Sequence, residues 1–313
     1  MPTLSTQIHY EKEIGDYMDY KGYNLSQKDK TVTVGNIKDF DPVHTFECGQ
    51  CFRWVRQVDG SYTGVARGRV LNVSVENGML ILKNTDIDDF KNIWFYYFDL
   101  GRDYSKIKEA VMKDDIMKEA VAFGWGIRLL KQDIWETLIS FIISANNRIP
   151  RIMKTVGVIS KLYGETLEMD GKHYYSFPGI KKLAQSSVED LEVCKGGFRC
   201  KYILNSSRMI EEDEINLEKI HLMDTESARK ELMRFSGVGP KVADCTLLYS
   251  GTKYDVFPTD VWVKRVMEEL YFKREAGLKE IQRFAADYFG DLAGFAQQYL
   301  FYFARENKIG TME

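Results

Sequence analysis

The chain has 313 residues, of which 44% are hydrophobic and 28% charged, and its formal net charge is −3. This composition is typical of a globular protein of two or three domains, and the slight acidic excess argues against binding nucleic acid through bulk charge alone. No apolar run approaches the roughly 18 residues of a membrane span, and the N-terminus lacks the apolar core of a signal peptide.

Residues 31 to about 84 show the alternating pattern of short β-strands. The expected strands are residues 31–34, 51–55, 62–65 and 71–75. Asp59-Gly60 and Asn77-Gly78 occupy positions where hairpin turns are expected. The pattern predicts an antiparallel sheet in the first part of the chain.

From Thr85 onward the signals become helical. Asp133, with Glu136 three residues later, predicts a capping box at the start of an apolar helix. Pro150 fits the first turn of the next helix, and Gly164 fits its end. Further helix limits are expected at Ser187 with Asp190, at Gly251, and around the aromatic-rich last segment, 287–305.

The fold class that follows is α+β. An antiparallel β domain with flanking helices is expected at residues 28–127, followed by an all-α core at residues 128–313. A helix-hairpin-helix is expected within this core at about residues 225–251. Residues 1–27 form an N-terminal extension to which we assign no structure or role.

The most informative stretch is residues 232–260. It predicts a helix, a Gly237-Val238-Gly239 turn, and a second helix with Lys241 in its first turn. A Gly-X-Gly turn between helices can present bare backbone N–H groups to a phosphate. A neutral lysine amine beside that phosphate could attack an electrophilic sugar carbon and form a Schiff base.

Asp260 follows Pro258 and Thr259 at a predicted helix N-terminus. Backbone N–H groups and the helix dipole stabilise an ionised carboxylate there. Such a carboxylate could stabilise positive charge on a sugar as its glycosidic bond breaks. From spacing alone, two plainer interpretations stay open: Asp260 as a helix cap only, and Lys241 as a phosphate contact.

Cys48 and Cys51 have the spacing of a zinc or redox pair. A second pair at zinc-ligand spacing is missing, because Cys194 and Cys200 are too far apart. The total of five cysteines, an odd number, favours reduced cytoplasmic thiols over a disulfide framework. We therefore expect no metal at these cysteines, and the C-terminal region lacks the cysteines of an iron–sulfur cluster.

At residues 232–260 the chain resembles the helix-hairpin-helix DNA glycosylases with a Gly/Pro-rich loop and a trailing aspartate, the HhH-GPD superfamily. Further segments narrow the resemblance to the 8-oxoguanine DNA glycosylase/AP lyases, over roughly Thr31 to Arg305. These segments are 49–54 (GQCFRW), 127–133 (IRLLKQD), 141–147 (FIISANN) and 294–297 (GFAQ).

The resemblance implies base excision repair, in which the damaged base is flipped out of the duplex. It implies Lys241 as the nucleophile at C1′ and Asp260 as its electrostatic partner. Release of the base leaves a Schiff base, and β-elimination then nicks the strand. No metal or redox cofactor is required for this chemistry.

The resemblance also implies two sets of backbone contacts at the hairpin. The amides that would hold a DNA phosphate are those of Gly237, Gly239 and Val242. The carbonyls that would hold a structural monovalent or divalent cation are those of Met233, Phe235 and Val238.

Base recognition is implied at four residues. The Gly49 carbonyl would accept a hydrogen bond from N7–H, which 8-oxoguanine has and guanine lacks. Gln297 would read the pairing edge, and Phe301 and Cys245 would sandwich the ring. Without the resemblance, Phe301 and Cys245 would be interpreted as core residues and Gly49 as a turn glycine.

The partner base is implied to be read by a separate set. Asn146 would fill the gap left by the flipped base, while Arg151 and Arg199 would reach the opposing cytosine, although both arginines could equally be phosphate contacts. Phe198 stands where better-known members of the family carry a wedging tyrosine, and Trp262 stands where they carry a histidine. We therefore expect a weaker preference for cytosine opposite the lesion.

Two alternatives remain: a glycosylase for another oxidised or alkylated base, and a non-catalytic DNA-binding protein. Lys241 paired with Asp260 disfavours the second, because simple binding requires neither, and Gly49 with Gln297 favours an oxidised purine. The expected partner is double-stranded DNA containing 8-oxoguanine, bound by a monomer that needs no membrane or obligate protein partner. Its expected location is the cytoplasmic nucleoid in a prokaryote or the nucleus in a eukaryote.

Overall fold

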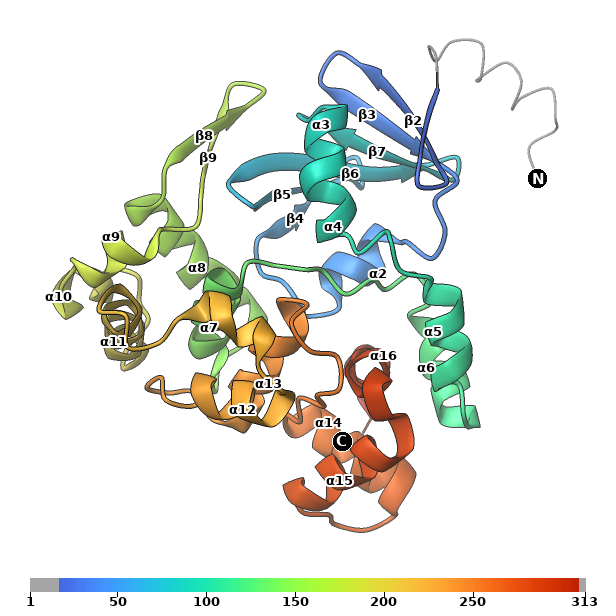
Figure 1. Cartoon of the computed structure of the whole chain (residues 1–313), viewed down its shortest axis with the longest axis vertical. Helices are drawn as coiled ribbons and strands as arrows, with labels where there is room; N and C mark the ends of the chain where they lie inside the picture. Colours follow the sequence, from blue (N-terminus) through green and yellow to red (C-terminus); the bar gives the residue numbers. More distant parts are fainter. Residues whose placement is uncertain (1–16, 310–313) are drawn as a thin grey trace.

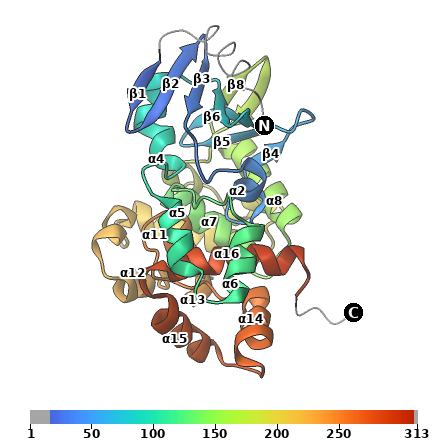
Figure 2. The ribbon, with the colours of Figure 1, turned by 90° about the vertical axis from the view of Figure 1, so that its right-hand side faces the viewer.

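The computed structural model describes residues 17–309. A sheet lies at one end of the molecule and a body of helices at the other, with α2 (Pro42–Glu47) between them (Figure 1). The view from the side shows the same division along the long axis (Figure 2). An antiparallel sheet followed by a largely helical region confirms the predicted α+β class.

The sheet has seven antiparallel strands in the order β1-β2-β3-β7-β6-β5-β4. The strands are β1 (Met18–Tyr20), β2 (Tyr23–Lys28), β3 (Thr31–Gly35), β4 (Trp54–Arg56), β5 (Tyr62–Ala66), β6 (Arg69–Glu76) and β7 (Met79–Lys83). Both expected hairpin turns are confirmed. Asn77 and Gly78 join β6 to β7 with φ of 51° and 78°, the positive values that a two-residue hairpin turn of type I′ requires.

The sheet begins earlier than the sequence pattern predicted. The expected boundary at residue 28 was wrong, because β1 and β2 pair with each other and β2 pairs with β3. The only strongly apolar residue of β2 is the fully buried Leu25, so this strand carries almost no alternating signal. The expected strand at residues 51–55 is also shorter, since only Trp54 and Val55 of it belong to β4.

A helical stretch packs against the sheet and closes its core. It consists of α3 (Ile87–Asp89), η1 (Phe90–Trp94) and α4 (Phe95–Tyr97). Phe90, Trp94 and Phe98 are fully buried in this core, together with Leu80 and Leu82 of the sheet. The aromatic side chains of this stretch therefore fill the apolar face of the sheet.

The helical part contains most of the remaining elements. They are α5 (Tyr104–Val111), α6 (Asp115–Phe123), α7 (Ile134–Ser144), α8 (Ile149–Tyr163), α9 (Ile180–Ala184), α10 (Val188–Glu192), α11 (Arg199–Glu211), η2 (Leu217–Leu222), α12 (Thr225–Leu232), α13 (Pro240–Tyr249), α14 (Val261–Val266), η3 (Met267–Phe272), α15 (Leu278–Phe289), η4 (Gly290–Leu292) and α16 (Ala293–Glu306). A hairpin of β8 (Thr166–Met169) and β9 (Lys172–Tyr175) projects beside them (Figure 1).

The predicted helix caps are largely confirmed. The Asp133 carboxylate accepts a hydrogen bond from the Glu136 amide at 3.0 Å, but the Glu136 side chain lies 3.6 Å from Arg53 and does not complete a capping box. Ser187 and Asp190 do form a complete box. The expected last helical region, 287–305, contains the end of α15, η4 and most of α16, and the backbone turns at Gly290 with φ of 55°.

The two cores interlock across the expected domain boundary at residue 127. Cys48 and Phe52 come from the sheet-bearing part but belong to the core of the helical part, and so do the buried residues of α5 and α6. In the other direction, Leu130 belongs to the core under the sheet. The boundary drawn from the sequence therefore does not separate two packing units.

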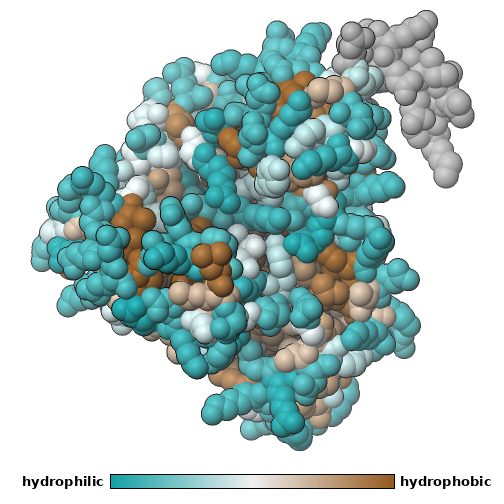
Figure 3. Space-filling model, viewed as in Figure 1, coloured by the Kyte–Doolittle hydropathy of each residue, from teal (hydrophilic) through white to brown (hydrophobic). Residues whose placement is uncertain are grey.

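Within residues 17–309, no helix is both long enough and apolar enough to cross a membrane. The face shown in Figure 3 is mostly hydrophilic, with apolar residues gathered in small groups near its middle.

Candidate active site

A pocket of about 820 Å³ brings together residues from distant parts of the chain. Lys241 comes from the start of α13, Asp260 from the residue before α14, and Phe301 from α16. Gly49 and the turn between α7 and α8 complete the wall. A pocket with few convergent polar groups among apolar walls is the expected form of a binding site.

Lys241 lies in the first turn of α13, which Pro240 opens. Its Nζ lies 5.1 Å from the centre of the Phe141 ring, and its positive charge acts on the thiol of Cys245. Burial raises the pKa of Cys245 to about 11, and the nearby lysine charge acts in the opposite direction. The thiol therefore stays neutral near pH 7 and does not form a competing thiolate beside the amine.

Asp260 is the N-cap of α14. Its Oδ1 accepts a hydrogen bond from the Val263 amide at 2.9 Å, as the sequence predicted for a cap. The preceding Thr259 is buried and donates its hydroxyl to the Phe257 carbonyl at 2.9 Å, which fixes the turn that leads into the helix. The carboxylate is therefore held at the pocket wall by its own helix.

The hairpin between α12 and α13 leaves its amides available. Gly237 has φ of 80°, and a Cβ there would lie 2.4 Å from the Tyr202 ring, so only glycine fits. Nothing lies within 4 Å of a Cβ built on Gly239. In the described part of the chain, the amides of Gly237, Gly239 and Val242 donate to no backbone carbonyl. A phosphate at the start of α13 could accept from all three.

The carbonyls expected to hold a cation lie in the same hairpin. The Phe235 carbonyl accepts a hydrogen bond from the Val238 amide at 3.1 Å. The carbonyls of Met233 and Val238 accept no backbone hydrogen bond from any described residue. Carbonyl oxygens without donors suit a hard cation, so this donor set fits the expected ion.

Gly49 sits on a tightly held turn. Its φ is 87°, and a Cβ there would lie 2.9 Å from Phe301 and 3.0 Å from Arg305. The peptide groups on both sides are fixed by glutamines: Gln298 donates to the Cys48 carbonyl at 2.9 Å, and Gln132 donates to the Gln50 carbonyl at 2.7 Å. Throughout residues 17–309, no donor reaches the Gly49 carbonyl itself.

The other predicted base contacts are placed less uniformly. Phe301 is partly exposed and lines the pocket, whereas Cys245 is buried beside Lys241. Gln297 is 3% exposed and is not among the residues that line the pocket, and its Oε1 has no hydrogen-bond partner among the described residues. A buried amide oxygen without a donor favours a ligand that supplies one.

The predicted opposite-base residues divide into two groups. Asn146 is exposed at the tip of the turn between α7 and α8, with φ of 49°, and Phe198 is 58% exposed. Arg199 is buried, and its guanidinium donates to the carbonyls of Ala145 and Asn146. Arg199 therefore holds this turn, which the sequence did not predict, while Arg151 is exposed.

Burial, followed by the charge of Arg151, lowers the pKa of the Arg199 guanidinium. The two arginines are thus close enough to repel each other. A phosphate or an acceptor edge of a base between them would relieve this repulsion.

Sequence reasoning missed three residues at this site: Gln132, Gln298 and Arg305. The two glutamines hold the Gly49 turn, and Arg305 lines the pocket. Gln298 stands 250 positions from its partner, so no local spacing could have revealed the contact.

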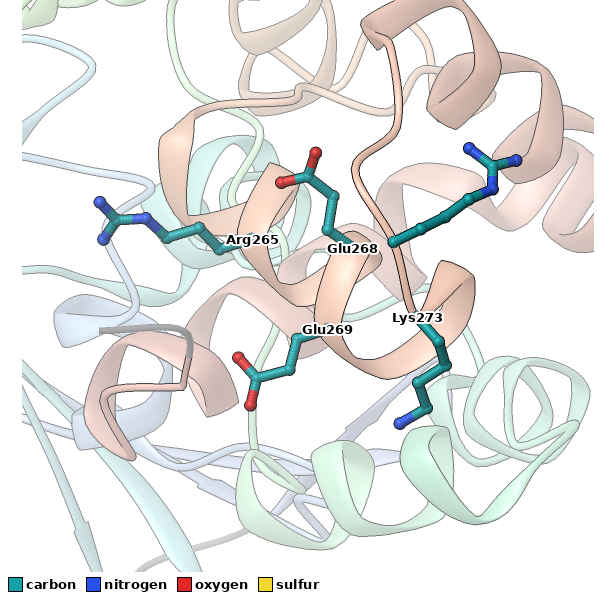
Figure 4. A pocket seen from close by; sticks show the side chains of 5 residues that line it. Arg265, Glu268, Glu269 and Lys273 are labelled. Atoms are coloured by element: carbon teal, nitrogen blue, oxygen red, sulfur yellow. The ribbon is translucent and has the colours of Figure 1, made fainter. Parts of the chain in front are cut away.

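A second hollow, of about 470 Å³, is far more open (Figure 4). Its lining residues are Arg265, Glu268, Glu269, Lys273 and Arg274. The labelled side chains point away from one another in Figure 4, and Glu268 already pairs with Lys264 at 2.5 Å. No set of groups converges here, so the 820 Å³ pocket is the candidate site.

Residues 23–138 match the 8-oxoguanine DNA glycosylase N-terminal domain, and residues 139–289 match the HhH-GPD superfamily of base excision DNA repair proteins. A probable N-glycosylase/DNA lyase of Methanothermobacter thermautotrophicus is 31% identical over 302 residues, which cover 87% of this chain and 96% of that protein. The chain belongs to the 8-oxoguanine DNA glycosylase family. It is therefore an N-glycosylase/DNA lyase of base excision repair.

Two solved structures of the family are similar over nearly the whole chain. MBOgg1, in complex with a low affinity DNA ligand, is 54% identical with a TM-score of 0.90, over 91% of this chain and 99% of that one. The 8-oxoguanine glycosylase/lyase of Clostridium acetobutylicum, in complex with double-stranded DNA containing cytosine opposite 8-oxoguanine, is 47% identical with a TM-score of 0.89. That match covers 91% of this chain and 98% of that one.

Proposed function

We propose that Lys241 and Asp260 carry out the reaction of this family: excision of 8-oxoguanine from duplex DNA, followed by cleavage of the abasic strand. The observation that carries the assignment is the single pocket shared by Lys241, Asp260, Gly49 and Phe301. A volume of about 820 Å³ is ample for a flipped purine nucleotide, because small-ligand sites range over about 300–1,000 Å³.

The chemical step begins at the sugar of the flipped nucleotide. The ammonium of Lys241 first gives up a proton to solvent, and the resulting amine attacks C1′. The bond from C1′ to N9 breaks, and its electron pair leaves with the base. Asp260 stabilises the positive charge that develops on the sugar. The amine then loses its proton, the ring oxygen accepts one as the ring opens, and a Schiff base remains.

Strand cleavage follows from this Schiff base. Its positive charge acidifies C2′–H, and loss of that proton expels the 3′ phosphate by β-elimination. Water then hydrolyses the Schiff base and releases Lys241. No redox step occurs in this sequence, so no redox cofactor is required.

The hairpin holds the DNA during these steps. The amides of Gly237, Gly239 and Val242 bind a phosphate at the positive end of α13. The carbonyls of Met233, Phe235 and Val238 would hold a cation, which would supply positive charge near that phosphate. The unpaired carbonyls of Met233 and Val238 support this ion. The pocket has room for one flipped nucleotide, which supports a monomer as the acting form. Because its substrate is duplex DNA, we propose that it acts on the genome, in a prokaryotic nucleoid or a eukaryotic nucleus.

Opposite-base reading requires a rearrangement. Arg199 holds the turn of Ala145 and Asn146, so it contacts an opposing cytosine only after it releases these carbonyls. Phe198 has no hydroxyl with which to reach a base edge. We therefore propose a weak preference for cytosine, with Asn146 and Arg151 entering the duplex first.

The test is borohydride trapping on a duplex with one 8-oxoguanine opposite cytosine. Wild type should form a covalent protein–DNA adduct, and Lys241→Gln should form none. Lys264→Gln is the matched control, because Lys264 also lines the pocket but is paired with Glu268. An adduct that survives in Lys241→Gln and disappears in Lys264→Gln would overturn the assignment, and an adduct only on other lesions would discard the base-pocket roles.

A further inference from the structure

Arg305 of α16 stands at the pocket wall with one nitrogen left unpaired. Its Nη2 donates to the Glu47 carbonyl and lies 2.7 Å from Glu306, while its Nε donates to Glu306 at 2.9 Å. The remaining nitrogen, Nη1, is buried and has no hydrogen-bond partner among the described residues. The guanidinium is thus anchored at two of its three nitrogens.

The unpaired nitrogen lies against the Gly49 turn. A Cβ built on Gly49 would be 3.0 Å from Nη1, and the guanidinium carbon lies 5.4 Å from the centre of the Phe301 ring. Gly49, Phe301 and Arg305 therefore form one corner of the pocket. This corner contains both a carbonyl and a charged N–H group without partners.

An unpaired buried donor needs an explanation. The guanidinium stays charged at any physiological pH, and a buried charged donor without an acceptor is costly. Most buried polar groups in folded proteins have a hydrogen-bond partner, and at a pocket wall a bound ligand can supply one that the protein does not. The occupant of this corner should therefore bring an acceptor to Nη1 of Arg305.

The edge of the oxidised base supplies that acceptor. In 8-oxoguanine, N7 carries a hydrogen and C8 carries a carbonyl oxygen, so a donor and an acceptor stand side by side. In guanine, N7 is an acceptor and C8 carries only hydrogen. The Gly49 carbonyl is an acceptor and the Arg305 N–H is a donor, and both belong to the same corner of the pocket, so together they complement this edge.

We propose that Arg305 is a specificity-determining residue that donates a charge-assisted hydrogen bond from Nη1 to O8 of the flipped base. This inference rests on the proposed function, in which the Gly49 carbonyl accepts from N7–H. The two contacts then read both atoms that oxidation changes. The cation–π contact of the guanidinium with the Phe301 ring and its anchor at Glu47 hold the donor in place before the base arrives.

The test compares two bases in single-turnover excision. 8-Thioguanine keeps N7–H but replaces O8 with sulfur, a much weaker acceptor. Wild type should excise 8-oxoguanine faster than 8-thioguanine. Arg305→Met keeps the packing but has no donor, so the ratio of these two excision rates should be about 10- to 100-fold smaller in this variant than in wild type. A merely structural role would slow both bases equally and leave the ratio unchanged, which would overturn the proposal.

Two controls separate this result from other failures. Lyase activity on a preformed abasic duplex needs Lys241 but no base pocket, so Arg305→Met should retain this activity. Arg283→Met, which changes an exposed arginine on α15, is the matched variant and should retain it too. If Arg305→Met does not fold, Arg305→Gln replaces it in the test. This variant keeps a neutral donor, so the ratio of the excision rates of 8-oxoguanine and 8-thioguanine should fall by a smaller factor. An unchanged ratio would overturn the proposal. Absence of trapping by wild type on any duplex would instead refute the proposed function.

Discussion

Gln298 offers a test of how the base-reading turn is held in place. Its side chain is fully buried, its Nε2 donates to the Cys48 carbonyl at 2.9 Å, and its Oε1 has no partner within the described residues. The Cys48 carbonyl belongs to the peptide that leads into Gly49. The substitution Gln298→Met keeps the volume of the side chain and removes both polar atoms.

The stability of this variant should change little, because two effects oppose each other. Leaving the buried Cys48 carbonyl unpaired costs about 1–3 kcal/mol, and removing the unpaired amide oxygen of Gln298 returns a similar amount. The free energy of unfolding should therefore change by about 1 kcal/mol or less. The Gly49 carbonyl, however, loses its fixed direction, and a hydrogen bond of about 0.5–1.5 kcal/mol to N7–H weakens, which slows excision about 3- to 10-fold.

The assay measures excision of 8-oxoguanine and lyase activity on a preformed abasic duplex, both under single-turnover conditions. We expect the first rate to fall and the second to stay unchanged. Gln57→Met is the matched control, since Gln57 is partly exposed, does not line the pocket and donates to the Val55 carbonyl at 2.8 Å. Equal slowing of both activities, or no slowing of either, would refute the view that Gln298 acts through the Gly49 turn.

Three further outcomes are expected. Gly237→Ala should lower the free energy of unfolding by about 2–4 kcal/mol in urea titrations and weaken DNA binding, because Gly237 has φ of 80° and a Cβ there would lie 2.4 Å from Tyr202. Gly239→Ala is the control and should lower the free energy of unfolding far less. Similar losses in the two variants would contradict this. Burial raises the pKa of the Cys48 thiol to about 12, so the native protein should react slowly with thiol reagents at pH 8. The unfolded chain loses this proton near pH 9 while the folded chain keeps it, so the free energy of unfolding should fall as the pH rises through 9. Fast labelling of native Cys48 at pH 8 would contradict the burial. Excision opposite cytosine and adenine should proceed at similar rates, and Phe198→Tyr should increase the preference for cytosine; a hundredfold preference in wild type would contradict our interpretation of Phe198.

The parts of the molecule that the sequence predicted best are those encoded by neighbouring residues. Asn77-Gly78 specifies its hairpin because both residues tolerate positive φ, and Pro240 with Lys241 specifies the start of α13. The Asp170-Gly171 turn of the β8–β9 hairpin carries the same kind of signal, with φ of 51° and 69°, but each flanking strand has only four residues and none of them is buried.

The parts that escaped prediction depend on contacts between distant segments. Arg199 was expected to face DNA, but its position depends on where the turn after α7 lies relative to α11. Gln298 and Arg305 lie on α16, where a helical pattern indicates only which face is buried. Their contacts with the turn around Gly49 arise when the whole chain is folded, so spacing along the sequence contains no trace of them.

The interlocked cores also limit how this enzyme can be divided. The two family segments meet between residues 138 and 139, in the middle of α7, whose residues are almost all buried. A fragment cut at that border would expose half of an apolar helix, and one ending at residue 289 would lack α16, which supplies Gln297 and Phe301. The β part and the helical part therefore fold as one unit, and we expect them to be inherited and exchanged between relatives together. A chimera that joins two enzymes of this family at the border should aggregate and not combine their specificities.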